Sequence, residues 1–151
     1  MPGEAISLAQ VEARRLMKSS MGSEHLLLGL IRHREGVGGK VLVLLGVELD
    51  EARGLVESIF GRGRRPSDGL RLTSDWKAVL GAAEEDARVL NHSIVSTAHL
   101  LLGLVREPQA RGHQVLKAMG VDLGRMRELA RKEVRDIEDP GGFVDFVRRL
   151  S

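Results

Sequence analysis

Three side chains able to bind ligands stand together early in the chain: the Ser23 hydroxyl, the Glu24 carboxylate and the His25 imidazole. The apolar run Leu26-Leu27-Leu28-Gly29-Leu30 follows at once, so we expect all three at the start of a helix, with Ser23 capping it. A carboxylate in the first turn of a helix is stabilised by the unpaired amides and the helix dipole, and it can equally contact a ligand. Both roles remain open for Glu24.

Neither His25 nor the later His99 has the spacing of a metal site. The position one helical turn further on is glycine in both cases, Gly29 and Gly103, where a second ligand would be needed. The remaining histidines are scattered and show no zinc-binding spacing: His33, His92 and His113. We therefore expect structural hydrogen bonds from His25 and His99, with no metal and no cofactor.

Motifs of catalysis are missing from the sequence. There is no cysteine to act as a nucleophile and no Gly-x-Ser-x-Gly elbow. There is also no Gly-x-x-x-x-Gly-Lys-Ser/Thr phosphate loop, because the glycine cluster Gly36-Val37-Gly38-Gly39-Lys40 has the wrong spacing and is followed by Val41. We expect a protein that is neither an enzyme nor an ATPase.

The ligand-binding pattern occurs twice. Ser23-Glu24-His25-Leu26-Leu27-Leu28-Gly29-Leu30 is matched by Thr97-Ala98-His99-Leu100-Leu101-Leu102-Gly103-Leu104, 74 positions later. We interpret this as a duplicated fold unit in which the shared residues are structural. The informative difference is Glu24 against Ala98, where one copy carries a carboxylate and the other a methyl group.

Composition is that of a globular protein. The 151 residues are 42% hydrophobic and 29% charged, with a formal net charge of +2, which is weak support for nucleic-acid binding. The N-terminus, Met1-Pro2-Gly3-Glu4, does not resemble a signal sequence, and no apolar run approaches the ~18 residues that span a bilayer. We expect a cytoplasmic protein that does not bind membranes.

Helical spacing of apolar residues predicts an all-α fold of two tandem four-helix repeats related by a pseudo-twofold axis. Within the first repeat we expect helices at about 4–17, from Ser23 to about Arg32, one ending at Gly46, and one from Leu49 to Phe60. In the second, we expect a long helix capped at Thr73-Ser74-Asp75, then helices from Thr97, up to Gly120, and from Leu123 towards Ile137. No strand pattern persists.

We expect one domain over 1–138 and a short helical C-terminal extension over 139–151. Within the domain, repeat one covers about 4–61, a Gly- and Arg-rich linker about 61–72, and repeat two about 73–137. The extension carries Phe143 and Phe146, which is notable in a chain whose aromatic content is 3%, and we expect these two side chains to dock onto a partner.

These features resemble the Clp N-terminal domain, the all-α pseudo-twofold module at the front of the AAA+ unfoldases of the Clp family, and the ClpC branch most closely. The resemblance covers roughly Ala5 to Lys132 and is carried by Gly22-Ser23-Glu24-His25-Leu26-Leu27-Leu28-Gly29-Leu30, by Glu35-Gly36-Val37 and by their later echo. Because the phosphate loop is absent, the chain resembles the stand-alone N-domain proteins that lack the AAA+ modules.

The resemblance implies a docking platform for substrates and adaptors, and in some ClpC-like members a phosphoarginine is bound in each repeat. In such a site a carboxylate pairs with the guanidinium group, while amides at a helix N-terminus, helped by a hydroxyl, receive the phosphate. Glu24 matches the family's guanidinium-binding glutamate, with Ser23 and His25 beside it.

The second copy of this implied site is degraded. Thr97 is retained there, but Ala98 removes the carboxylate. Thr73 matches the family's helper threonine of the second repeat, and its first-repeat equivalent would precede the chain. The resemblance therefore implies that each site keeps half of its pair, with weak phosphoarginine binding in the first repeat and none in the second.

The leading interpretation is a non-catalytic module that binds Clp protease components, their clients or adaptors, including arginine-phosphorylated proteins, as an adaptor or a decoy. A second interpretation is a structural accessory subunit that docks onto a Clp peptidase or ATPase ring through Phe143 and Phe146. A third is nucleic-acid binding through the arginines of the linker, where no aromatic residues interleave and a solvated loop is favoured: Arg62, Arg64, Arg65 and Arg71.

Overall fold

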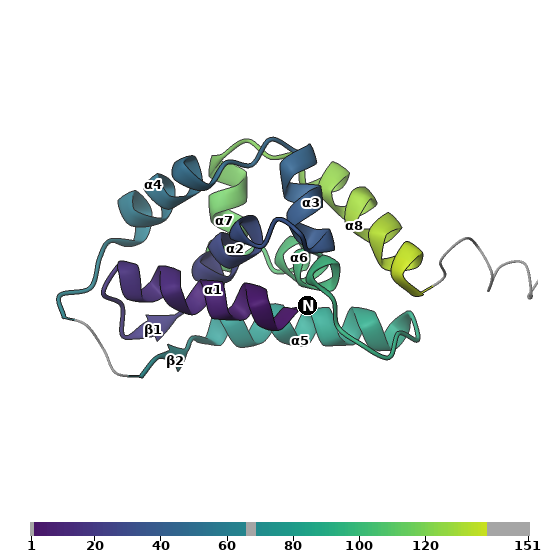
Figure 1. Ribbon diagram of the computed structural model, residues 1–151, viewed down its shortest axis with the longest axis horizontal. Coiled ribbons are helices and arrows are strands. Elements are labelled where there is room, and N and C mark those ends of the chain that lie inside the picture. The colour runs from purple at the N-terminus through teal and green to yellow at the C-terminus, as the bar shows by residue number, and fades with distance from the viewer. Residues whose placement is uncertain (1, 66–68, 139–151) are drawn as a thin grey trace, which may run out of the picture.

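The computed structural model describes residues 2–65 and 69–138, so that Phe143, Phe146 and the predicted extension lie outside the described residues. Its helices form two runs of four (Figure 1). The first run is α1 (Pro2–Arg15), α2 (Ser23–Arg32), α3 (Val37–Leu44) and α4 (Leu49–Phe60). The second is α5 (Ser74–Val89), α6 (Thr97–Arg106), α7 (Arg111–Ala118) and α8 (Leu123–Glu138). The all-α prediction is confirmed, while the proposed domain limits stay a prediction.

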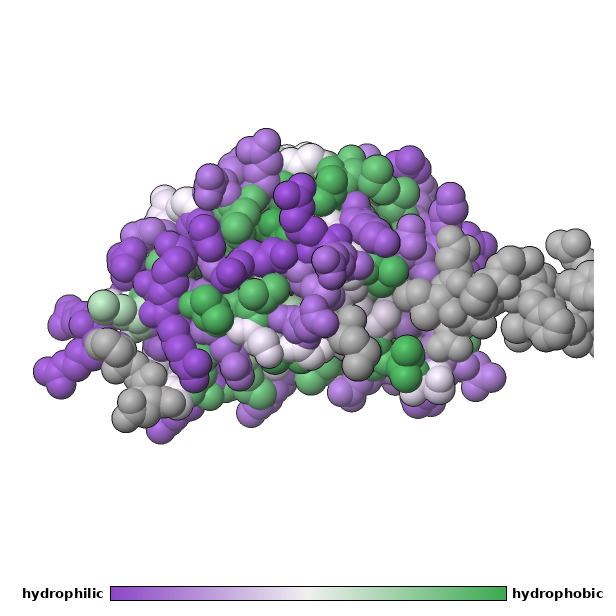
Figure 2. All heavy atoms as spheres, in the orientation of Figure 1, coloured by the Kyte–Doolittle hydropathy of each residue, from purple (hydrophilic) through white to green (hydrophobic). Residues whose placement is uncertain are grey.

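Helices α2 and α6 lie at the centre of the molecule, and the other helices surround them (Figure 1). Every residue of α2 from Ser23 to Ile31 is buried, and so is every residue of α6 from Thr97 to Val105. The two leucine triplets therefore belong to the core, as their pattern predicts. Apolar side chains reach the face shown in Figure 2 only in small separate patches between polar ones.

Helix ends follow the predicted signals closely. Gly46 and Gly120 have φ of +73° and +76°, the left-handed conformation that costs glycine little, and they terminate α3 and α7. Gly61, with φ of +75°, follows the end of α4. Thr73 caps α5, because its hydroxyl accepts a hydrogen bond from the Trp76 amide at 3.2 Å.

A short parallel strand pair, β1 (Ser20–Met21) and β2 (Arg71–Leu72), escaped the sequence analysis. Hydrogen bonds of 3.1 Å from the Arg71 amide to the Ser19 carbonyl and from the Thr73 amide to the Met21 carbonyl extend the pair. Strands of two residues leave no periodic pattern in a sequence, so they could not be predicted. The pairing holds the start of α5 beside the start of α2.

A buried carboxylate joins three helices of the first repeat. Glu12 of α1 is fully buried and accepts hydrogen bonds from Arg53 of α4 at 2.7 and 2.9 Å and from Arg32 of α2 at 3.0 Å. Burial opposes ionisation, but the hydrogen bonds and charge of Arg53, together with Arg15 and Arg32, keep the pKa of Glu12 below its usual value.

Within residues 2–65 and 69–138, no helix is long and apolar enough to cross a membrane.

The glycine of each Leu-Leu-Leu-Gly-Leu run permits a close helix contact. A Cβ on Gly29 would collide with the backbone of α1 at the Ala5 carbonyl and the Ala9 amide. In the second repeat, a Cβ on Gly103 would collide with the Val79 carbonyl of α5. Both repeats thus pack their first and second helices backbone against backbone, which explains why both copies retain glycine here.

Substituting Gly29→Ala should destabilise the protein by about 2 kcal/mol or more, because backbone atoms of α1 cannot yield to the added methyl group as a flexible side chain would. The matched control is Gly54→Ala on α4, where a Cβ meets open space and the gain in helix propensity should stabilise by about 0.5–1 kcal/mol. Urea unfolding measures both changes. Equal stability of Gly29→Ala and the wild type would contradict the close contact.

Candidate ligand-binding site

The hydroxyls of Ser23 and Thr97 bind the opposite repeat and do not cap their own helices. Ser23 Oγ accepts a hydrogen bond of 2.8 Å from the amide of Gly112 in α7, and Thr97 Oγ1 accepts one of 2.8 Å from the amide of Gly38 in α3. The N-cap residues are instead Gly22 and Ser96, so the predicted capping roles of Ser23 and Thr97 are wrong. Both side chains sit one residue further into the helix, where they face the other repeat.

The histidines that follow make structural hydrogen bonds, as predicted. His25 Nδ1 accepts from the Gly22 amide at 3.0 Å, and His99 Nδ1 accepts from the Ser96 amide at 2.9 Å. Each imidazole thereby satisfies an amide at the buried start of its helix. No group of three or more residues able to hold a metal ion occurs in the part of the chain that the structure describes.

Glu24 lies at the buried start of α2, with only 2% of its side chain exposed. Its Oε2 atom accepts a hydrogen bond of 3.2 Å from Nη1 of Arg111, at the start of α7. Its Oε1 atom is buried and has no hydrogen-bond partner, and it lies 3.8 Å from His25 Nδ1, which is too far for a hydrogen bond. A Cβ on Gly22 would collide with this oxygen, so glycine at that position makes room for the carboxylate.

Thr73 and Asp75, at the start of α5, lie in the same cluster. Asp75 Oδ2 accepts from Ser23 Oγ at 2.5 Å and from the Arg111 amide at 3.0 Å, while Thr73 Oγ1 bonds to Asp75 Oδ1. A Cβ on Gly22 would lie 3.2 Å from Thr73 Oγ1 as well as against Glu24. The assignment of Thr73 to a separate second-repeat site is therefore wrong, because β1 and β2 bring the start of α5 to the start of α2.

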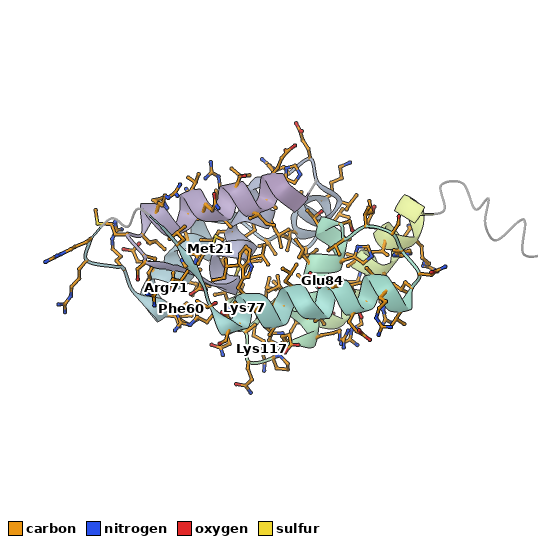
Figure 3. The ribbon with its side chains drawn as sticks, turned by 90° about the horizontal axis from the view of Figure 1, so that it is seen from below. Met21, Phe60, Arg71, Lys77, Glu84 and Lys117 are labelled. Carbon is orange, nitrogen blue, oxygen red and sulfur yellow. The ribbon has the colours of Figure 1, made fainter. Side chains whose placement is uncertain are left out.

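Arg111 covers the outer side of this cluster. Its guanidinium carbon lies 4.7 Å from the centroid of the Phe60 ring at the end of α4, and half of its side chain is exposed. Figure 3 shows Phe60 near the beginning of α5, in the region of Lys77 and Arg71. The cluster therefore draws on α2, α4, α5 and α7, and its outer edge carries the Arg111 guanidinium group.

The equivalent position of the second repeat has lost the charged groups. Ala98 replaces Glu24 and is fully buried, and Val37 stands 74 positions before Arg111. The Thr97 hydroxyl accepts a hydrogen bond from the Gly38 amide. The structure thus brings Ser23, Glu24, His25 and Thr73 together at one end of the buried helix pair, whereas Thr97 and Ala98 stand in the corresponding place of the other repeat.

Burial and hydrogen bonding set the electrostatics of the cluster. Burial raises the pKa of Glu24 against the opposing effects of its own backbone amide and of Arg111. For Asp75, burial is outweighed by the hydrogen bonds from the Ser23 and Thr73 hydroxyls and from backbone amides, and its pKa is lowered. Burial, with Lys18 and Arg111 nearby, lowers the pKa of His25 to about 4, so this imidazole is neutral at physiological pH.

Comparison with known proteins identifies the family. The profile described as "Clp repeat (R) N-terminal domain" matches residues 3–119 and 71–143. The chain belongs to the Clp repeat N-terminal domain family. It is 41% identical over 125 residues to the "Negative regulator of genetic competence ClpC/MecB" of Bacillus subtilis, which covers 83% of this chain and 15% of that protein.

The chain is also similar to other members of the Clp family. The chain is 39% identical over 125 residues to the chaperone protein ClpB of Oceanobacillus iheyensis, covering 83% of this chain and 16% of that protein. The crystal structure of the N-terminal domain of the chaperone ClpD from Arabidopsis thaliana matches with a TM-score of 0.71 and 28% identity, covering 88% of this chain and 94% of that one. The chain therefore spans only a small fraction of the ClpB and ClpC relatives and nearly all of the isolated ClpD domain.

Sequence reasoning missed four members of the cluster: Gly22, Phe60, Asp75 as a bridging group, and Arg111. A signal for one of them was present, because the repeat comparison pairs Arg111 with Val37 and Glu24 with Ala98. Glu24 and Arg111, each of which has an uncharged counterpart in the other copy, form an ion pair in the structure.

The lowered pKa of His25 predicts a loss of stability in acid. An unfolded histidine binds a proton near pH 6.5, whereas the folded one resists protonation down to about pH 4. The contribution of His25 is therefore fully present above pH 6.5 and is lost as the pH falls towards 4, by up to about 3 kcal/mol.

His25→Asn isolates this effect, because asparagine can accept the Gly22 amide hydrogen bond but does not titrate. Urea unfolding of both proteins between pH 7 and pH 4.5 should show a steeper loss of stability for the wild type. Carboxylates such as Glu12 and Asp75 titrate alike in both proteins and cancel in the difference. Parallel stability curves would contradict the prediction.

Proposed function

We propose that this Clp-family chain is a non-catalytic, cytoplasmic protein-binding module that receives clients or adaptors of a Clp protease, acting as an adaptor or a decoy. We further propose that the cluster around Glu24 binds an arginine side chain that is phosphorylated on its guanidinium group. The family membership supports the general role. The chemistry of the cluster supports the specific ligand.

The buried Glu24 carboxylate is the observation that carries the proposal. A buried acid is costly unless it is paired, and Glu24 has one oxygen on Arg111 and one with no hydrogen-bond partner. A guanidinium group is the ligand best suited to it, because its planar set of N–H donors can satisfy both carboxylate oxygens at once. The Phe60 ring offers such a cation an aromatic face.

Groups suited to a phosphate stand next to this carboxylate. The Arg111 amide at the start of α7 and the hydroxyls of Ser23 and Thr73 all donate to one anionic group, which is now the Asp75 carboxylate. Amides at a helix N-terminus favour an anion through their partial positive charge. A phosphorylated guanidinium carries a positive group and a negative group side by side. The positive group suits the Glu24 carboxylate, and the phosphate suits the neighbouring donors that now bind Asp75.

Binding at a single site is expected. The second repeat has the buried Ala98 in place of the carboxylate, so a ligand guanidinium would lack the buried partner that Glu24 provides in the first repeat. Thr73, which sequence comparison assigned to the second repeat, supports the Glu24 cluster instead. We accordingly expect one phosphoarginine for each chain.

Isothermal titration calorimetry with phosphoarginine and with a phosphoarginine peptide tests this proposal. We expect a stoichiometry near one, and Glu24→Ala, which installs the residue of the second repeat, should weaken binding by roughly tenfold to a hundredfold. Glu84→Ala is the matched control, because Glu84 is exposed further along α5 and should not affect binding (Figure 3). Equal binding by wild type and Glu24→Ala would overturn the proposed site, and no binding by either would overturn the proposed ligand.

A further inference from the structure

Two residues of the chain already occupy the two halves of the candidate site. The guanidinium group of Arg111 is bound to Glu24 Oε2 at 3.2 Å and lies 4.7 Å from the centroid of the Phe60 ring. These are the contacts that we assign to a ligand guanidinium. Arg111 therefore stands where the cationic half of the ligand would bind.

Asp75 stands in the anionic half. Its carboxylate accepts hydrogen bonds from the Ser23 hydroxyl at 2.5 Å, from the Arg111 amide at 3.0 Å and from the Thr73 hydroxyl. The three donors come from α2, α7 and the residue that caps α5. A phosphate oxygen that used these donors would have to replace the carboxylate oxygens one for one.

We infer that Arg111 and Asp75 act together as an internal surrogate ligand, which a phosphorylated arginine must displace in order to bind. This inference rests on the proposed function and adds the residues that control access to the site. Ligand binding then becomes an exchange, in which one guanidinium replaces another at Glu24 and one oxyanion replaces another at the helix amides.

The exchange determines which ligands can compete. Removal of Arg111 alone would leave the Glu24 carboxylate buried and unpaired, so an anion without a cationic group, such as inorganic phosphate, cannot replace it. Free arginine can replace the guanidinium group but leaves Asp75 in the anionic half. A ligand with both groups on adjacent atoms replaces both in a single event.

The location of Arg111 allows it to leave without disturbing the fold. It is the first residue of α7, and half of its side chain is exposed, so a rotation about its side-chain bonds would carry the guanidinium into solvent. Its counterpart in the first repeat is Val37, at the same position of α3, so the backbone at this position accommodates an uncharged side chain where Ala98 stands in place of Glu24.

Arg111→Val tests the inference, with Arg125→Val as the matched control, because Arg125 is an exposed arginine in the first turn of α8. If the internal pair is closed in about 90% of molecules, removing Arg111 should raise the affinity for phosphoarginine about tenfold. Calorimetry with phosphoarginine, free arginine and inorganic phosphate measures this change. Arg125→Val should bind like the wild type.

A second variant tests the inference independently, in case Arg111→Val does not fold. Asp75→Asn keeps the size of the side chain and its acceptor oxygen but removes the charge that competes with phosphate, and it should also bind phosphoarginine more tightly than the wild type. Thermal unfolding of each variant establishes that the protein remains folded.

The possible outcomes separate the two proposals. Tighter binding by Arg111→Val and by Asp75→Asn supports the surrogate. Unchanged or weaker binding by Arg111→Val, while the wild type binds through Glu24, overturns the surrogate and leaves the proposed function intact. If the wild type and both folded variants fail to bind phosphoarginine, the proposed function is wrong and the surrogate falls with it.

Discussion

The complete burial of two helix N-termini is the constraint on which this structure depends. Helices α2 and α6 are surrounded on all sides, so the amides, hydroxyls and imidazoles at their starts cannot reach bulk water and must find partners inside the protein. Exchange between the repeats meets part of this demand, because Ser23 accepts from Gly112 and Thr97 accepts from Gly38 at the same distance of 2.8 Å. The duplication therefore supplies the partner groups as well as a second copy of the fold.

The two ends of this arrangement have diverged. At one end the first repeat contributes the Glu24 carboxylate, and Arg111 and Asp75 of the second repeat surround it; at the other end Ala98 carries only a methyl group. A buried charge of this kind is expensive, and a scaffold alone has no need of it, as the second repeat demonstrates. This asymmetry is the physical reason for placing a ligand at one end of the molecule and none at the other.

Sequence reasoning predicted the helices well because their signals are local. Glycine at positions 46 and 120, the Thr73 cap and the limits Leu49–Phe60 all depend on neighbouring residues. It was wrong about Ser23 and Thr97, because a hydroxyl at the cap and one at the next residue look alike in a sequence and only the opposite repeat distinguishes them. It also placed Thr73 away from Glu24, since their proximity depends on the pairing of β1 with β2. Contacts such as that of Arg111 with Glu24, which join residues far apart in the chain, gave no local signal.

The central claim is that one end of the buried helix pair binds the ligand and the other does not. A titration of the isotope-labelled protein with phosphoarginine, followed by two-dimensional amide NMR, tests it residue by residue. The account predicts large shifts for the amides of Ser23, Arg111 and Gly112, and none for their repeat counterparts Thr97, Val37 and Gly38. Shifts confined to the Thr97 end, equal shifts at both ends, or an unchanged spectrum at high ligand concentration would contradict it.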